Sequence, residues 1–409
     1  MKGAVLVLNV GSSSLKFALY SGDAGPVVLL CRGEIAAAAG GVTLSARDDA
    51  DVQLLHRDLE SGGDPALWPG LLLVWIENTF LDIPLRAAAH RVVHGGVRYA
   101  APVIIDAEVV RELRRLIPLA PLHQPHALAA IEALAISHPA LVQIACFDTA
   151  FHHTLSLVES SFALPRVLRD EGLRRYGFHG LSYEYIAGRL PALLGERAAA
   201  GRVVIAHLGA GASMCALRAG RSVATTMSLT PLDGLAMGTR CGAIDPGALL
   251  YLLQEKRMSP AALSDLLYHD SGILGVSGLS GDMQTLLASD APEAQEAIDL
   301  FVYRIVRELG SLAAALGGID ALVFTGGIGE HSARIRQRVC EGAAWLGVAV
   351  DAAANAAHAQ RITGAGSPTS AWAIGTDEDE MIMHHTRLLL RPETQVNAPT
   401  APLPCIPSP

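Results

Sequence analysis

Continuous apolar runs near the start of the chain predict buried strands. Val5 to Leu8 are all apolar, and after a turn of Gly11 and three serines the apolar pattern resumes from Leu15 to Tyr20. A run without polar alternation is typical of a strand that is covered on both faces. Backbone N–H groups in the Gly/Ser turn between the two predicted strands can point at an anion.

A second strand–turn–strand pattern lies nearly half a chain further on. The apolar run at 203–206 is again followed by a glycine-rich turn and a further apolar segment. Asn9-x-Gly11 lines up with His207-x-Gly209, and residues 18–19 line up with 216–217 at the same offset. Two such strand–turn–strand patterns predict duplicated domains whose turns face each other across a cleft. Because the match is short, chance similarity is the competing explanation.

A third glycine-rich segment follows the apolar residues 322–324. It runs from Thr325 to Ser332, and Ser332 is placed to cap a helix that continues through Ile335 and Val339. A glycine-rich turn from strand to helix is a usual place for a nucleotide. On their own, however, such glycines are more often simple turn formers.

Helical spacing near 3.6 residues appears between these strand segments. It is found at Glu108 to Ile117, at Ala127 to Ile136 and at Glu293 to Leu316. Helix and strand segments therefore alternate along the chain, which predicts an α/β fold.

Composition narrows the class of protein but does not identify a function. The 409 residues suggest two domains, and 51% of them are apolar, enough for sizeable cores. The net charge of −9 argues against a protein that binds nucleic acid through a basic surface. The six cysteines are scattered and form no CxxC pair, which favours reduced thiols in a cytoplasmic protein. The sequence shows no signal-peptide pattern and no apolar stretch long enough to span a bilayer, so no membrane segment is expected. The proline-rich tail after Arg391 is expected to be disordered.

Several segments carry polar residues of the kind that phosphoryl transfer needs. Arg91 precedes two glycines, Asp148 follows the apolar run 141–147, and Arg240 lies in a glycine-rich loop. Taken singly, each has an ordinary structural explanation, such as a surface arginine at the start of a strand. Together with several histidines they supply positive charge around a moving phosphoryl group. The chain has no GxxxxGK[ST] loop, no protein-kinase HRD or DFG set, no HExxH and no GxSxG.

In the order in which they occur, these segments resemble the acetate kinase family. The matching pieces run from residue 5 to about residue 385 and include LNVGSSSLK, HRVVHGG, FDTAFH, RRYGFHG, TPLDGLAMGTRCG, FTGGIGE and TDEDEMI. The family belongs to the superfamily of actin-like ATPases, heat-shock chaperones and sugar kinases. The resemblance implies two duplicated RNase H-like α/β domains with a nucleotide cleft between them, and a homodimer. It implies an N-terminal domain of residues 1–148 that is rejoined by a C-terminal helix at about 382–393, a nucleotide-binding domain of residues 149–381, and a tail of residues 394–409.

The resemblance also implies roles for individual residues. Arg91 and Arg240 would bind the acetate carboxylate and the transferring phosphoryl group, with His179 as a hydrogen-bond donor. Asp148, Glu378 and Asn9 would hold or position Mg²⁺ (or Mn²⁺), and Asn9 would also contact the transition state. The acetate pocket would further consist of Val93, Leu122, His123, Phe178 and Pro231. The ATP or ADP site would consist of Ser12, Ser14, Lys16, His207, Gly209, Ala210, Gly211, Asp282, Met283, Gln284, Gly327, Ile328, Gly329 and His331.

The implied activity is reversible, Mg-dependent, in-line transfer of the γ-phosphoryl group of ATP to acetate. This sequence departs from the family pattern at several positions. Ala210 and His331 stand where the family usually has Asn, Gln284 replaces a frequent Arg, Gln124 a frequent Asn, and Leu181-Ser182-Tyr183 replaces Thr-Ser-His. The alternatives are a propionate or butyrate kinase on the same scaffold and a non-catalytic nucleotide-binding regulator of the actin-like fold.

Overall fold

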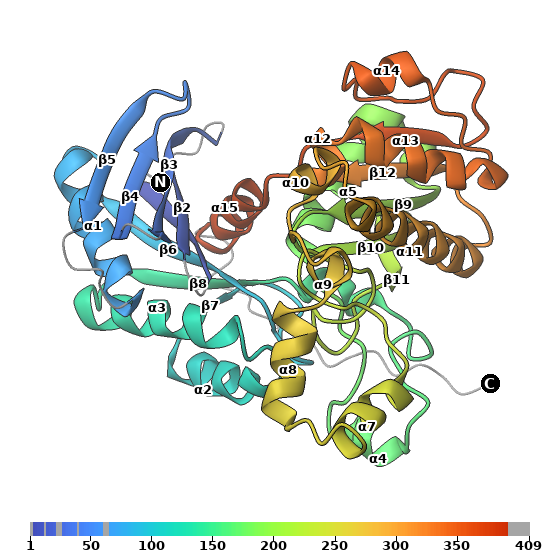
Figure 1. Cartoon of the computed structure of the whole chain (residues 1–409). Helices are drawn as coiled ribbons and strands as arrows, with labels where there is room; N and C mark the ends of the chain where they lie inside the picture. Colours follow the sequence, from blue (N-terminus) through green and yellow to red (C-terminus); the bar gives the residue numbers. More distant parts are fainter. Residues whose placement is uncertain (1–2, 12–13, 22–26, 39–40, 60–64, 392–409) are drawn as a thin grey trace, which may run out of the picture.

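Two β-sheets form the framework of the protein. The computed structural model describes residues 3–11, 14–21, 27–38, 41–59 and 65–391. Within these ranges the strands form one sheet of eight, in the order β5-β4-β3-β2-β1-β6-β8-β7, and one of five, in the order β11-β10-β9-β12-β13. Figure 1 shows the first sheet in blue and teal and the second in green and orange, on opposite sides of the molecule.

The strands of the first sheet are β1 (Ala4–Val10), β2 (Ser14–Ser21), β3 (Leu29–Ala38), β4 (Gly41–Arg47), β5 (Gln53–Leu59), β6 (Leu85–Val92), β7 (Val103–Ile104) and β8 (Val142–Phe147). Those of the second sheet are β9 (Arg202–Leu208), β10 (Ala212–Arg218), β11 (Arg221–Thr225), β12 (Ala321–Thr325) and β13 (Ser370–Ala373).

The two sheets repeat the same topology. In each, an antiparallel hairpin, β1–β2 or β9–β10, is extended by a third antiparallel strand. Two parallel strands then continue the sheet from the first strand of the hairpin, β6 and β8 in one sheet and β12 and β13 in the other. This repeat supports duplication over chance similarity as the explanation of the two sequence starts.

The register corrects one detail of the sequence match. Leu6 pairs with Leu19, whereas its counterpart Val204 pairs with Ala216. Leu19 therefore corresponds to Ala216, so the second-strand match of residues 18–19 with 216–217 is displaced by one position. Because side chains alternate between faces, a displacement of one residue would exchange the two faces of the strand.

Helices cover the sheets. They are α1 (Trp68–Thr79), α2 (Ala107–Arg115), α3 (Gln124–Ser137), α4 (Arg166–Asp170), α5 (Gly180–Leu194), α6 (Glu196–Ala199), α7 (Pro246–Gln254), α8 (Pro260–His269), α9 (Gly272–Ser277), α10 (Met283–Leu287), α11 (Pro292–Leu316), α12 (Gly326–His331), α13 (Ala333–Gly342), α14 (Ala352–Ala356) and α15 (Glu378–Leu389). Short 3-10 helices span Pro65–Leu67, Ile117–Leu119, Ala150–Thr154 and Ala344–Leu346.

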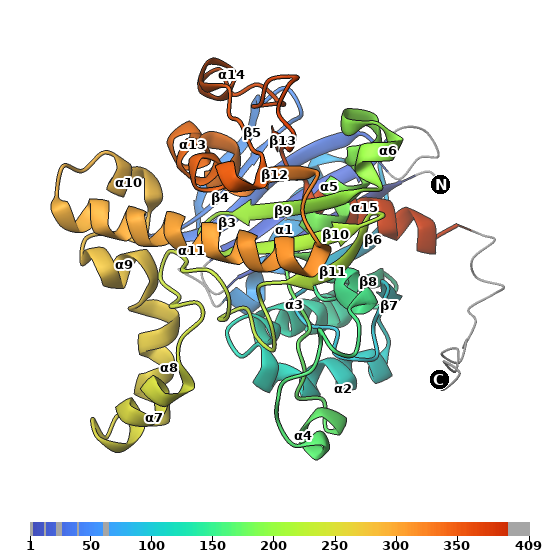
Figure 2. The same ribbon diagram turned by 90° about the vertical axis from the view of Figure 1, so that its right-hand side faces the viewer.

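Strand β1 is buried on both faces, as its continuous apolar run predicts. Leu6 and Leu8 pack in one core cluster with side chains of α1 and α3. Val5 and Val7 point to the opposite face and pack with residues of α5 and α15. Figures 1 and 2 show α15, in red, beside the first sheet although it is the last helix of the chain.

Helix α5 connects the two halves of the molecule. Leu181 packs in the cluster of the first sheet, whereas Tyr183, Ile186 and Leu190 pack against β9 and β12 of the second. On the other face of the second sheet, the long helix α11 buries Ile298, Val302, Ile305, Leu309 and Leu312, the stripe that its spacing predicts. The start of α5 is therefore fixed between the two sheets.

Three further expectations can be compared with the structure. The predicted helices correspond to α2, α3 and α11, and Ser332 caps α13 by accepting a hydrogen bond from Ile335 N. Among the described cysteines, Cys31, Cys146, Cys215, Cys241 and Cys340 are free thiols. No helix within the described ranges is long and apolar enough to cross a membrane. Ser12, Cys405 and the tail of residues 394–409 lie outside the described residues.

Candidate active site

A cavity of about 290 Å³ lies where elements of both sheets meet. Strands β1, β6 and β8 run parallel, so their carboxyl ends lie at one edge of the first sheet and bring Asn9, Arg91 and Asp148 together. Further lining residues come from the segment between residues 178 and 240, among them His179 and Arg240. The full lining is Asn9, Val10, Gly11, Ser14, Lys16, Arg91, Val93, His123, Ala127, Asp148, Phe178, His179, Gly211, Pro231 and Arg240.

Arg91 is held by two carboxylates. Its Nε and Nη2 donate to both oxygens of Asp148 at 2.7–3.2 Å, and its Nη1 lies 3.4 Å from Glu378 Oε2 at the start of α15. Burial alone would lower the pKa of Arg91, but the charges of Asp148 and Glu378 raise it above its usual value. Burial raises the pKa of Asp148, and the hydrogen-bonded guanidinium of Arg91 acts in the opposite direction. The guanidinium is therefore oriented before any ligand binds.

Arg240 has a different environment. Its Nη1 donates to the carbonyl oxygen of Pro231 at 3.1 Å and lies 3.8 Å from the sulfur of Met237. No carboxylate of the described residues forms an ion pair with it. Burial and the nearby charge of Arg91 lower its pKa. A part-buried guanidinium without a counter-charge is well suited to bind an anion from the cavity.

His179 occupies a strained position at the start of α5. Its φ is 58°, and the next residue, Gly180, donates from its N–H to the carbonyl oxygen of Asp148 at 2.8 Å. A Cβ at Gly180 would overlap that oxygen, so the close approach requires glycine. A Cβ placed on Gly211 would lie 3.5 Å from His179 Nε2 and 3.7 Å from Arg240 Nη1. The imidazole and the second guanidinium thus flank the same glycine.

The histidines of the site are neutral. The rings of His179 and His207 are stacked with centroids 4.3 Å apart. Burial, the other ring and the two arginines lower the pKa of His179 well below its usual value. Burial, together with nearby arginine charge, also lowers the pKa of His207 and of His123 to about 4. Neutral imidazoles can donate hydrogen bonds here without adding charge.

Glycine-rich turns adjoin the cavity on the side of the second sheet. Gly209 N donates to Gly211 O at 3.1 Å, and Gly238 N donates to Ala210 O at 3.0 Å. Gly281, which precedes Asp282 and α10, approaches Gly238 so closely that a Cβ on Gly238 would lie 2.9 Å from its carbonyl oxygen. A Cβ on Gly209 would lie 4.0 Å from Gly327 N, at the first turn of α12. The turn at 209–211 therefore lies beside the first turn of α12, and Gly211 lines the cavity together with Gly11 and Ser14 of the first glycine-rich turn.

The individual residues expected at the nucleotide differ in exposure. Asp282 caps α10 through Thr285, and Gln284 and His331 are exposed. Met283 is only 3% exposed and packs in the core with Ile328 at its edge, so its side chain does not face solvent. Gly329 is buried, and its carbonyl oxygen accepts a hydrogen bond from Arg336.

The apolar part of the cavity differs from the expected set. Val93, Phe178 and Pro231 line it, but Leu122 does not, whereas Val10 and Ala127 do. Gln124 is fully buried and bridges the backbone of His94 with hydrogen bonds in both directions.

Sequence reasoning missed the polar residues behind the cavity. Ser213 on β10 contacts His179 Nδ1 and Ser182 on α5 contacts His207 Nδ1, each at 2.8 Å. The carboxylate of Glu330 accepts from Gly326 N at 2.8 Å and from Thr376 N at 3.2 Å, which ties α12 to the segment that leads into α15. No local motif marks the serines, because these contacts join residues 25 or more positions apart.

The oxygen ligands near Arg91 suit a hard divalent cation. Asp148 and Glu378 both bind Arg91, and the charge of Glu378 raises the pKa of Asp148, so the two carboxylates lie close together. Asn9 adds an amide oxygen on the same wall. The described residues contain no group of three or more His, Cys, Asp or Glu side chains for a metal. The pair of carboxylates fits a hard divalent cation, because such ions in phosphoryl-transfer sites are bound by one or two carboxylates together with phosphate oxygens and water.

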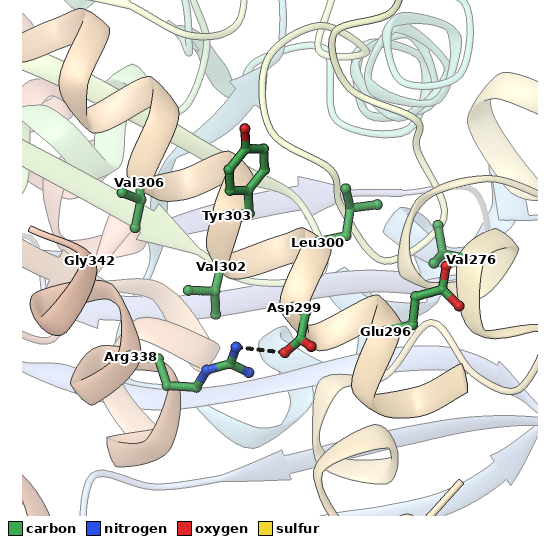
Figure 3. Close-up of a pocket in the computed structure, with 9 residues that line it drawn as sticks. All are labelled: Val276, Glu296, Asp299, Leu300, Val302, Tyr303, Val306, Arg338 and Gly342. Atoms are coloured by element: carbon green, nitrogen blue, oxygen red, sulfur yellow. Dashed lines mark hydrogen bonds and ion pairs between the residues drawn. The ribbon is translucent and has the colours of Figure 1, made fainter. Parts of the chain in front are cut away.

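A larger hollow, of about 810 Å³, lies on the outer side of α11. Figure 3 shows that apolar side chains such as Val302 and Val306 line it, with Asp299 and Arg338 paired at 2.6 Å. Arg338 is paired with Asp299, and the other charged side chain of the lining, Glu296, is an acid, so the hollow lacks a set of convergent donors for an anion. The smaller cavity between the sheets is therefore the candidate active site.

The duplicated sheets and the polar cavity between them define the class. This is a two-domain α/β protein of the actin-like ATPase and sugar-kinase fold, with RNase H-like domains, as the family resemblance implies. The chain belongs to the acetokinase family, whose profile matches residues 4–384.

Known relatives agree with this assignment. The chain is 58% identical to the acetate kinase of Rhodopseudomonas palustris (strain TIE-1) over 94% of this chain and 98% of that protein. The structure matches that of a propionate kinase from Francisella tularensis subsp. tularensis SCHU S4 with a TM-score of 0.86 and 34% identity, over 94% and 98% of the two chains. It matches Porphyromonas gingivalis acetate kinase with a TM-score of 0.84 and 33% identity, over 95% and 100%.

Proposed function

We propose that this protein is an ATP-dependent carboxylate kinase that phosphorylates acetate reversibly, giving acetyl phosphate and ADP. The observation that carries the proposal is the presence of Arg91 and Arg240 on the walls of one cavity with His179 and Asp148. A nucleotide-binding regulator would have no use for a second guanidinium without a counter-charge next to a small apolar pocket. This argues against the alternative of a non-catalytic protein.

The proposed reaction needs charge neutralisation rather than a base. Acetate is ionised at neutral pH, so one of its oxygens attacks the γ-phosphorus directly. A P–O bond to acetate forms as the P–O bond to ADP breaks, and no proton has to be removed. Repulsion between two anions is the obstacle, and planar guanidinium groups that stay charged reduce it with paired hydrogen bonds.

Each side of the cavity then has a task. Arg91, already oriented by Asp148, and Arg240, with its unbalanced charge, bind acetate and the equatorial phosphoryl oxygens. His179 donates from Nε2 to the same group. Val93, Phe178 and Pro231 enclose the acetate methyl group. The turns with Ser14, Lys16 and residues 209–211 hold the phosphates of ATP, and the region of Gly327 and Asp282 holds the nucleoside.

Asp148, Glu378 and Asn9 would hold Mg²⁺ or Mn²⁺. A bound divalent cation would offset negative charge on the phosphate oxygens. Loss of activity on chelation, with recovery on adding either metal, is the expected result.

The division into domains belongs to the same proposal. We take residues 1–148, rejoined by the C-terminal helix, as one domain and residues 149–381 as the other. The packing of α15 on β1, β6 and β8 supports this, but the helix runs from Glu378 to Leu389 and not over the expected 382–393. A homodimer in the cytoplasm is proposed from the family resemblance, and sedimentation velocity measures its mass.

A hydroxylamine-trapping assay tests the proposal. Purified protein with ATP and Mg²⁺ is given acetate, propionate or butyrate, and the acyl hydroxamate is measured. We expect the highest kcat/KM with acetate and a lower value with propionate. A preference for propionate, suggested by the structural similarity to a propionate kinase, would move the assignment to that substrate. Absence of all three hydroxamates would rule out a carboxylate kinase for these acids.

A further inference from the structure

A buried chain of hydrogen bonds leads from α5 to the back of His179. The hydroxyl of Tyr183 lies 2.5 Å from Ser213 Oγ, which lies 2.8 Å from His179 Nδ1. Tyr183 and Ser213 are both 0% exposed. The chain joins α5, β10 and the cavity wall, and Tyr183 itself does not line the cavity.

The direction of these hydrogen bonds is set by the hydroxyl of Tyr183, the last group in the hydrogen-bonded series. If Tyr183 donates to Ser213 and Ser213 donates to His179 Nδ1, every proton has an acceptor. In the reverse direction, His179 donates from Nδ1, Ser213 donates to Tyr183, and the phenolic proton needs another acceptor. Among the described residues Tyr183 has no hydrogen-bond partner besides Ser213. A buried donor without a partner costs about 1–3 kcal/mol, so the first direction is favoured.

The phenol keeps its proton over the working pH range. Burial, with a smaller contribution from Cys215, raises the pKa of Tyr183 well above its usual value. A tyrosine is thus a fixed donor at this position. A neutral histidine, the residue usual in the family here, could donate or accept through either ring nitrogen.

We propose that Tyr183 is a positioning residue that holds His179 in the tautomer with its proton on Nε2. Nε2 lies on the side of Gly211 and Arg240, where the phosphoryl group is placed in the proposed function, on which this role depends. In the other tautomer Nε2 would present a lone pair to the phosphoryl oxygens, and the interaction would be repulsive. Tyr183 therefore acts on turnover through Ser213 and His179, without touching the substrate.

The test uses Tyr183→Phe, which removes only the hydroxyl, and Tyr99→Phe as the matched control. Tyr99 is also a buried tyrosine, its ring stacks on Phe147, and its hydroxyl has no hydrogen-bond partner among the described residues. The tautomer of His179 is read from ¹⁵N NMR of histidine-labelled protein, with His179→Asn to assign the signal. Ser213→Ala serves as a second variant that breaks the same chain.

In the wild type and in Tyr99→Phe we expect only the Nε2–H form. In Tyr183→Phe and Ser213→Ala we expect a mixture of both tautomers. Turnover of Tyr183→Phe should fall roughly 3- to 10-fold, with KM for acetate and ATP unchanged, because one hydrogen bond that acts only on the transferred group is weakened.

An unchanged Nε2–H form in Tyr183→Phe would overturn the proposal, as would an equal loss of turnover in Tyr99→Phe. If the wild type forms no acyl hydroxamate, the proposed function fails. The NMR comparison still decides whether Tyr183 sets the tautomer, because it does not depend on activity.

Discussion

Arg91 and Arg240 carry the same charge but differ in how it is balanced. Arg91 is bound by Asp148 and Glu378, so it enters the reaction pre-oriented with most of its charge compensated locally. Arg240 contacts only uncharged acceptors among the described residues. We infer that Arg91 mainly orients the bound acetate and phosphoryl group, whereas Arg240 provides most of the electrostatic attraction for the incoming anions. The cavity should thus bind acetate weakly without Arg240 even if its shape is intact.

The size of the acyl pocket gives a prediction at the residue scale. Val93→Ala enlarges the apolar wall, and the kcat/KM ratio of propionate to acetate should rise roughly 10-fold or more, because one methylene is worth about 1–3 kcal/mol in such pockets. Trapping of both hydroxamates measures the ratio. Val97→Ala, on the same segment but 60% exposed and outside the cavity, should leave it unchanged. Equal ratios in Val93→Ala and the wild type would mean that Val93 does not limit acyl size.

At the scale of elements, α5 positions the site. Its first residue touches the end of β8 through Gly180 N and Asp148 O, and its first turn contributes to the core clusters of both sheets. One short helix therefore sets the distance between Asp148 on one sheet and His179 beside the other.

Two glycines of α5 make a matched pair for testing this. Gly180→Ala brings a methyl group onto the Asp148 carbonyl oxygen, so unfolding free energy should fall by about 1–3 kcal/mol and turnover by roughly 10²-fold. Gly188 has open space around it, so Gly188→Ala should raise stability by about 0.5–1 kcal/mol and preserve turnover. Urea unfolding and the hydroxamate assay measure both. Wild-type turnover in Gly180→Ala would contradict a positioning role for this contact.

The sequence revealed the elements with strong patterns. Strands β1 and β9 show unbroken apolar runs because both of their faces are buried. Helices α2, α3 and α11 show the 3.6-residue spacing because one stripe of each helix is buried. Strands β3 to β5, of which β5 is at the edge of the sheet, were not predicted. Strand β5 is largely exposed, so burial imposes no pattern on its side chains.

The site could be predicted only where local motifs mark it. Arg91, Asp148, His179 and Arg240 stand in recognisable segments, and the structure places all four around one cavity. The sequence marks Tyr183 only as a departure from the family pattern and does not mark Ser213, and only the fold brings the two behind His179. The glycine turns were recognisable, but their mutual contacts depend on the register of β9 and β10.

At the scale of the whole molecule, buried neutral histidines link stability to pH. Burial lowers the pKa of five described histidines to about 4: His90, His94, His123, His152 and His207. In the unfolded chain they titrate near the ordinary value of about 6.5. Above about pH 6.5 they are neutral in both states. As pH falls towards 4 the unfolded state takes up protons first, so stability is lost across this range.

Thermal unfolding tests this linkage. The melting temperature should be highest above about pH 6.5 and should fall steadily to pH 4.5, with net proton uptake on unfolding measured by calorimetry at pH 5.5. Burial also raises the pKa of four described carboxyl groups, Asp379 to about 6 and Asp148, Glu159 and Glu308 above their usual values, and these act in the opposite direction. They are outnumbered, because burial lowers the pKa of His153 and His179 as well as that of the five histidines above. A melting temperature that stays constant or rises from pH 6.5 to 4.5 would show that these histidines are not buried as neutral groups.

The most direct test of the central claim is the kcat/KM for acetate of Arg240→Ala at saturating ATP and Mg²⁺. Arg240 is the better choice than Arg91, because removing Arg91 leaves the buried Asp148 unpaired and disturbs the fold as well. Arg338→Ala, at the Asp299 pair on the outer face, controls for loss of an arginine. We expect a fall of roughly 10²–10³-fold in Arg240→Ala and none in Arg338→Ala. Wild-type kcat/KM in a folded Arg240→Ala would contradict the account.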